Sequence, residues 1–169
     1  MNSASDSGLP RPTPDARRPT VQSDARRPTI QFHFNVEHRL LYACRVVRKA
    51  LAAGKSVLAS TRTADRLARF DAALWTFSAL DFVPHVYADS TLAARTPVLL
   101  APDAASAPAR DVLLQLDDDA PPGFAQVFSR FERVIEVVSR DDDDRSHARV
   151  RFRAYSDAGL APESHKVAE

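Results

Sequence analysis

Glycine is scarce in this chain of 169 residues, and the glycines that occur do not cluster. The four of them stand far apart in the sequence, as Gly8, Gly54, Gly123 and Gly159. Loops that cradle phosphate groups need closely spaced glycines, because the backbone amides must approach the phosphate. The chain therefore has neither a P-loop nor a glycine-rich dinucleotide-binding turn.

Cysteine and long apolar runs are also missing. The single cysteine, Cys44, excludes an intramolecular disulfide and fits a reducing compartment. A membrane-spanning helix needs about 18 or more consecutive apolar residues, and no such run occurs. The N-terminus has no apolar segment of the kind found in secretory signals. We therefore expect a cytoplasmic protein, and its net charge of only +1 gives no general attraction to nucleic acid.

Residues 1–29 are rich in Pro, Ser, Asp and Arg and have almost no large apolar side chains. Such a segment cannot bury enough surface to offset its chain entropy, so we predict a disordered tail. The hexapeptide DARRPT occurs twice in it, at Asp15–Thr20 and Asp24–Thr29. Its arginines could contact nucleic acid loosely, but the neighbouring aspartates offset part of their charge. A solvated extension is the preferred interpretation.

From residue 30 onward, strand-like and helix-like segments alternate. Residues 30–36, 56–59, 98–100, 112–116 and 133–138 have the apolar pattern of strands, and residues 37–53, 63–74, 123–130 and 141–158 that of helices. This order predicts βαβ units and a parallel sheet. We expect one α/β domain over residues 30–160, a Rossmann-like three-layer sandwich with a mostly parallel sheet and no dinucleotide-binding glycine loop. Residues 161–169 should form a flexible end.

No group of residues has the spacing of a catalytic or metal site. The aspartate runs Asp117–Asp119 and Asp141–Asp144 lack the alternating ligands of a calcium loop, so we interpret them as solvated surface. Cys44 lies on the apolar side of the first predicted helix and should be a small core residue. His85 should form hydrogen bonds within its own loop. The sequence therefore predicts a non-catalytic protein with no metal and no cofactor.

The last predicted helix has a cationic side. At about 100° per residue, one side of it gathers Arg145, Arg149, Phe152, Arg153 and Ser156. An apolar stripe of Ala148, Tyr155 and Ala158 adjoins this side, and Arg151 falls towards the stripe without an explanation from the pattern. Acids at the start and bases further on suit the helix dipole, which is one interpretation. The other is a site for an acidic peptide that ends in an aromatic residue and a free carboxylate.

The segment Leu74–Tyr87 concentrates large aromatic residues, among them the only tryptophan, Trp75, and also Phe82. Pro84 disfavours helical dihedral angles at Val83, so the preceding helix must end before this proline. Most large aromatic side chains are buried, which favours a core position for this loop. The alternative is an exposed binding site, because aromatic residues are enriched at interface hot spots.

Three blocks of residues around this segment resemble the bacterial DNA polymerase III chi subunit family: Arg66-Leu67, Asp71-Ala72-Ala73-Leu74-Trp75 and Asp81-Phe82-Val83-Pro84-His85. The resemblance covers most of residues 30–160. It implies an accessory subunit without catalytic residues, which links the clamp loader of the replicative polymerase to single-stranded DNA-binding protein. DNA would then be contacted only indirectly. A nucleotide- or phosphate-binding Rossmann-like enzyme remains the alternative, although the turn at residues 35–38 lacks glycine.

The resemblance also implies two binding surfaces. The acidic C-terminal tail of single-stranded DNA-binding protein would contact Val138, Arg145, Arg149, Phe152 and Arg153. Phe152 stands where the family has a tyrosine, and Arg153 where it has a lysine, so a hydroxyl is lost and the charge is kept. The psi subunit, or an equivalent partner in the clamp loader, would contact Trp75 and Phe82.

Overall fold

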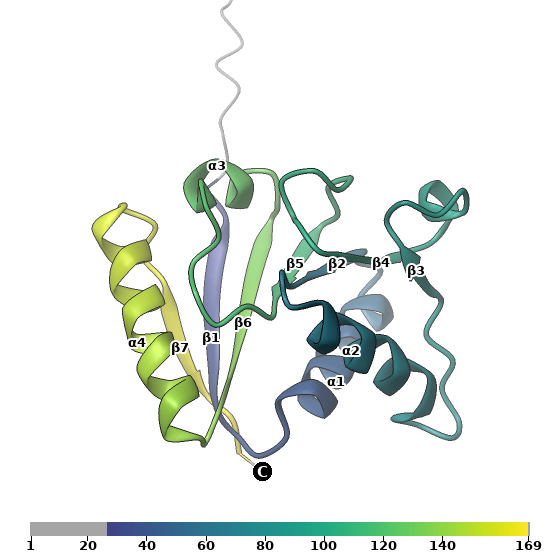
Figure 1. Ribbon diagram of the computed structural model, residues 1–169, viewed down its shortest axis with the longest axis horizontal. Helices are drawn as coiled ribbons and strands as arrows, with labels where there is room; N and C mark the ends of the chain where they lie inside the picture. Colours follow the sequence, from purple (N-terminus) through teal and green to yellow (C-terminus); the bar gives the residue numbers. More distant parts are fainter. Residues whose placement is uncertain (1–26, 169) are drawn as a thin grey trace, which may run out of the picture.

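The computed structural model describes residues 27–168, in which seven strands form one parallel sheet with helices on both faces (Figure 1). The strand order is β3-β4-β2-β5-β6-β1-β7. Helices α1 and α2 cover one face and α4 covers the other (Figure 1). The predicted three-layer α/β fold is confirmed. Among the helices of the described range, none has the length and hydrophobicity that a membrane span requires. Residues 1–26 of the predicted tail lie outside the residues that the structure describes.

The elements follow one another in the predicted order, with two additional strands. The strands are β1 (Thr29–Val36), β2 (Val57–Ser60), β3 (His85–Tyr87), β4 (Val98–Ala101), β5 (Val112–Gln115), β6 (Arg133–Ser139) and β7 (Glu163–Lys166). The helices are α1 (Arg39–Ala52), α2 (Ala64–Thr76), α3 (Phe124–Phe128) and α4 (Asp142–Asp157), with a short 3-10 helix, η1 (Ala93–Arg95).

Continuous apolar sequences form the centre of the sheet. All residues of β2, β4 and β5 are buried, because helices or loops cover both faces of these strands. The side chains divide into two core layers. One packs under α1 and α2 and contains Cys44, Phe70 and Leu74. The other packs under α4 and contains Phe32, Phe128 and Tyr155.

A bulge near the end of β1 changes the face on which its last residue lies. Asn35 adopts a left-handed φ of 71°, and the pairing with β6 shifts register between His33 and Val36. Val36 is consequently buried under α1 and α2, whereas Ile30 and Phe32 belong to the opposite layer. The sequence pattern placed all of these residues on one face, which is wrong for Val36. Phe34, before the bulge, stays beside Phe32 on the α4 side.

The two edge strands were not predicted. β3 lies within the segment expected to be a loop, and it pairs with β4. β7 lies within the end expected to be flexible, and its residues pair with β1 from Gln31 to Phe34. The side chain of Asn35 adds a hydrogen bond of 3.0 Å to the carbonyl of Val167. All four residues of β7 are exposed, so backbone pairing rather than an apolar pattern forms this strand.

Candidate functional site

A groove of about 600 Å³ lies between α4 and the strands β1, β6 and β7. We call it the α4 groove. Its lining residues are Phe32, Phe34, Val138, Arg145, Ala148, Arg149, Phe152, Arg153, Ser156 and Ser164. Aromatic and aliphatic side chains from the strands meet three arginines from the helix in one concave surface. A ligand with an apolar end and negative charge would suit this combination.

Helix α4 begins with a complete N-terminal cap. The carboxylate of Asp141 accepts hydrogen bonds from the backbone amides of Asp143 and Asp144, at 2.9 and 3.2 Å. Three further aspartates occupy the first turn, where the helix dipole favours negative charge. The dipole interpretation of the acidic run is thus consistent with the structure. It does not account for the arginines, which lie in the body of the helix.

The structure brings all five residues of the expected tail site together, because each of them lines the α4 groove. Of its arginines, Arg145 is partly neutralised by Asp142, 3.3 Å away on the same helix. Arg149 and Arg153 are exposed and have no ion-pair partner among the residues that the structure describes. The sequence did not identify Phe32, Phe34 and Ser164 as part of the site. The alternation of β1 did place the two phenylalanines on one face, but only the fold shows that α4 stands over them.

Arg151 lies on the other side of α4, fully buried. Its Nε donates a hydrogen bond of 3.0 Å to the carboxylate of Glu136 on β6, which is equally buried. The hydroxyl of Tyr155 donates to the second oxygen of the same carboxylate at 2.6 Å. Arg151 also donates to the carbonyl of Asp118. These contacts explain an arginine that the sequence pattern left unexplained. Ala158, which was placed in the adjoining apolar stripe, is exposed.

Burial governs the protonation of this group. It raises the pKa of Glu136, while the charge of Arg151 and the hydrogen bond from Tyr155 oppose that rise. Burial, together with the nearby carboxylate of Glu136, also raises the pKa of Tyr155. The tyrosine hydroxyl therefore keeps its proton and acts as a donor.

A second candidate surface consists of Trp75, Leu80 and Phe82, which we call the aromatic patch. The side chains are 58%, 96% and 68% exposed, so the expectation that this segment packs into the core is wrong for them. It is correct for Leu74 and Val83, which are buried. The rings of Trp75 and Phe82 lie 5.6 Å apart between centroids. The exposed rings therefore form one continuous apolar surface.

The buried ring of His85 packs against Trp75 of the aromatic patch. The ring lies 4.8 Å from that of Trp75, and its nitrogens lie 2.6 Å from the carbonyl of Val83 and 3.0 Å from the carboxylate of Asp71. The predicted hydrogen bond within the loop is confirmed. The contact with Asp71 also ties the loop to α2. The exposed tryptophan is therefore held by a buried, hydrogen-bonded neighbour.

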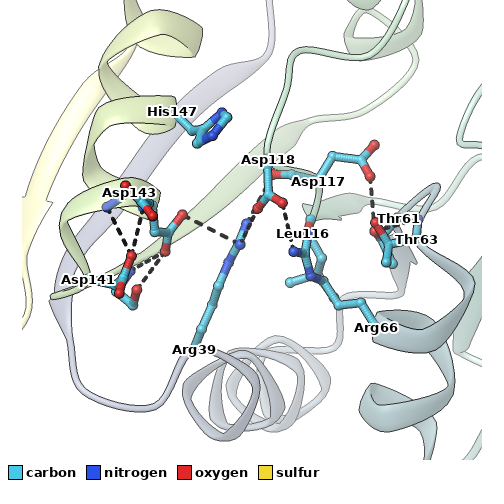
Figure 2. A network of polar contacts seen from close by, with 12 residues as sticks. Arg39, Thr61, Thr63, Arg66, Leu116, Asp117, Asp118, Asp141, Asp143 and His147 are labelled. Atoms are coloured by element: carbon cyan, nitrogen blue, oxygen red, sulfur yellow. Dashed lines mark hydrogen bonds and ion pairs between the residues drawn. The ribbon is translucent and has the colours of Figure 1, made fainter.

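The carboxyl edge of the central strands carries a dense set of ion pairs (Figure 2). Arg39 and Arg66 donate to the carboxylate of Asp118 at 2.9 and 2.8 Å, and Arg39 also lies 3.5 Å from Asp144. Asp117 accepts from the hydroxyl of Thr61 at 2.9 Å. Burial would raise the pKa of Asp118, but the hydrogen bonds and charges of Arg66 and Arg39 outweigh it and lower the pKa to about 2.

Parallel α/β sheets bind their ligands at this edge. Here it is lined by the chain's own paired charges, and its first turn has no glycine, which counts against the nucleotide-binding alternative. The expectation that Asp117–Asp119 is a solvated run is wrong for Asp117, which is buried, and correct for Asp119. Within residues 27–168, no three His, Cys, Asp or Glu side chains gather closely enough to hold a metal ion.

Cys44 is the one thiol of the chain. It is fully buried on the inner side of α1, as expected, and burial raises its pKa to about 12. A thiol with so high a pKa is protonated at neutral pH, and it is the thiolate that acts as a nucleophile. Cys44 is thus a core residue.

Comparisons with known proteins agree with one another on the family. Residues 28–163 match the family model described as DNA polymerase III chi subunit, HolC. The DNA polymerase III subunit chi of Pseudomonas aeruginosa is 33% identical over 129 residues, which are 76% of this chain and 87% of that protein. The corresponding subunit of Escherichia coli is 32% identical over 118 residues, which are 69% of this chain and 78% of that protein.

Among solved structures, a DEAD box protein from the hyperthermophile Methanococcus jannaschii is similar in fold, with a TM-score of 0.55 at 12% identity. The match covers 85% of this chain but only 42% of the DEAD box protein, and at this identity it shows the Rossmann-like fold alone. The family model and the two relatives carry the assignment. The chain belongs to the DNA polymerase III chi subunit family and is an accessory subunit of that polymerase.

Proposed function

We propose that the α4 groove binds the acidic C-terminal tail of single-stranded DNA-binding protein, and that the aromatic patch docks onto the psi subunit, or an equivalent partner, of the clamp loader. The chain is then a non-catalytic adaptor, and DNA is reached only through its partners. As a part of the bacterial replication machinery it would work in the cytoplasm. The two functions are supported by separate observations.

The unpaired guanidinium groups of Arg149 and Arg153 are the main support for tail binding. Other arginines of the fold, such as Arg39, Arg62 and Arg66, have aspartate partners. In the described part of the chain, Arg149 and Arg153 have none, and they stand beside an apolar hollow. A terminal carboxylate can pair with a guanidinium in bidentate fashion, and the hollow can take an aromatic ring.

Tail binding can be tested by calorimetric titration with a peptide that ends in Asp-Ile-Pro-Phe. We expect a Kd in the micromolar range that weakens as salt is added. Arg149→Ala should raise the Kd about ten- to a hundredfold, because a charged hydrogen bond contributes about 1.5–3 kcal/mol.

Two controls belong to this titration. Arg95→Ala removes the same charge from η1, towards the other edge of the sheet, and should leave the Kd unchanged. A peptide with an amidated C-terminus should bind more weakly than the free acid. Equal binding by the wild type, Arg149→Ala and Arg95→Ala would refute a tail site in the α4 groove.

The position of the aromatic patch supports the second function. The α4 groove lies along β1 and β7 at one edge of the sheet, whereas the patch lies on the last turn of α2 and the connection from α2 to β3, towards the other edge (Figure 1). Two partners could therefore bind at once. Large exposed apolar surfaces on soluble proteins commonly mark interaction sites.

Trp75→Ala and Phe82→Ala should each weaken binding to the psi subunit by about 2 kcal/mol, roughly thirtyfold in Kd, as expected of aromatic hot spots. Neither change should lower the thermal midpoint much, because both side chains are more than half exposed. Val150→Ala removes a similarly exposed apolar side chain from the outer side of α4 and is the matched control. A loss of psi binding that is equal in all three variants would argue against the patch.

A further inference from the structure

The buried group of Glu136, Arg151 and Tyr155 lies directly behind the α4 groove. Both charged side chains are completely inaccessible to solvent, and Tyr155 is as well. The carboxylate accepts one hydrogen bond from each of the two helix residues, at 3.0 and 2.6 Å. The Nη2 atom of Arg151 has no hydrogen-bond partner within the described residues. A pair this deeply buried is costly to desolvate, so it is weak evidence for stability.

The two donors of this group lie on a different side of α4 from the two unpaired arginines of the groove. Arg151 and Tyr155 are four residues apart and share one stripe of the helix, while Arg149 and Arg153 share another. At about 100° per residue the two stripes lie about 160° apart, close to half a turn. Any rotation of the helix that turns Arg151 and Tyr155 away from β6 therefore turns Arg149 and Arg153 relative to the groove by the same angle.

Apolar packing alone tolerates such rotations better than paired hydrogen bonds do, because burial is not directional. The carboxylate of Glu136 accepts both hydrogen bonds only when Arg151 and Tyr155 face β6. A single buried polar group can fix register between helices, which is the best-attested use of buried polarity.

Phe32 packs between the groove and the buried group. Its ring contacts Phe152 on the groove side, with centroids 5.2 Å apart, and Tyr155 on the buried side, 5.8 Å apart. The guanidinium of Arg151 also lies over the Phe32 ring, 6.0 Å from its centroid. The floor of the groove is thus packed against the buried group.

We propose that Glu136, Arg151 and Tyr155 are positioning residues, which hold α4 in the one rotation that points Arg149 and Arg153 at the tail. The inference extends the proposed tail binding and depends on it. None of the three residues is among those that line the α4 groove. Their effect is expected in affinity even where the fold keeps its stability.

The test replaces the whole group by apolar residues of similar size, as Glu136→Leu, Arg151→Met and Tyr155→Phe together. Buried ion pairs replaced in this way commonly leave the stability unchanged or higher. We expect a triple variant with an unchanged or higher thermal midpoint whose Kd for the Asp-Ile-Pro-Phe peptide is about tenfold higher.

A double-mutant cycle with Arg149→Ala separates positioning from a purely structural role. In the wild type this change removes an aligned guanidinium, whereas in the triple variant it should cost less affinity, because Arg149 no longer faces the groove. A purely structural group would give the same loss in both backgrounds.

Each outcome is decisive. A stable triple variant that binds the peptide as the wild type does would overturn the proposal, and so would an additive cycle. If the triple variant does not fold, Tyr155→Phe alone decides, with the Kd measured well below its thermal midpoint: a Kd raised two- to threefold supports the proposal, and an unchanged Kd overturns it. A wild type that does not bind the peptide at all would instead refute the proposed function, and the inference with it.

Discussion

Arg151→Met alone should lower the free energy of unfolding by about 3–5 kcal/mol, because it leaves the buried carboxylate of Glu136 without its counter-charge. Glu136 has no solvent exposure, so water cannot replace the lost partner. Burial already raises the pKa of this carboxyl, and without Arg151 it should take up a proton at a still higher pH. Urea denaturation at neutral pH would measure the loss.

Arg153→Met is the matched control for this prediction. It removes the same charge two residues further along α4, where the side chain is exposed and unpaired within the described region. We expect less than about 0.5 kcal/mol from it, as for most surface substitutions. Arg153→Met should nevertheless raise the Kd for the tail peptide, since Arg153 lines the groove. Equal destabilisation by both would mean that the buried pair has no special role.

Phe32→Ala should cost about 3–5 kcal/mol of stability and should also abolish measurable binding of the tail peptide. The first effect follows from deleting a buried ring and leaving a cavity. Phe32 is only 3% exposed and packs against both Phe152 and Tyr155. The second effect follows because the same ring forms part of the groove lining. Thermal denaturation and calorimetric titration below the midpoint would measure the two effects.

Phe70→Ala separates these effects. Phe70 is fully buried in the core layer under α1 and α2, on the opposite face of the sheet. Its loss should be about as destabilising as that of Phe32. Binding of the tail peptide by the folded fraction should nevertheless stay close to that of the wild type. If Phe70→Ala weakens the tail affinity as much as Phe32→Ala does, the loss reflects general destabilisation rather than the groove.

The cationic side of α4 was predictable because helical periodicity is a local property. Once residues 141–158 are taken as a helix, the spacing of Arg145, Arg149 and Arg153 places them on one side whatever the rest of the chain does. The same holds for the parallel strands of the central sheet, because continuous apolar sequences indicate strands that are buried on both faces. The resemblance to the chi family then supplied the partner that such a surface would bind.

Other features depend on residues that are distant in the sequence. Residue type favoured burial of Trp75 and Phe82 and left an exposed site as the alternative. Only the fold of the described residues shows that both rings are exposed. The strand β7 has no apolar pattern, and its pairing with β1 joins residues more than a hundred positions apart. The residues of β7 alone therefore do not indicate that β1 is their pairing partner.

The sequence by itself determined the fold class, the family and the arginines that face the groove, because these follow from short-range spacing and from residue identity. Only the tertiary structure decided that Phe32 and Phe34 lie beneath those arginines and that Arg151 meets Glu136, fifteen positions away, inside the protein. The physical reason is that a groove and a buried ion pair both require surfaces from separate elements. Their meeting depends on how the whole chain packs, which no single segment encodes.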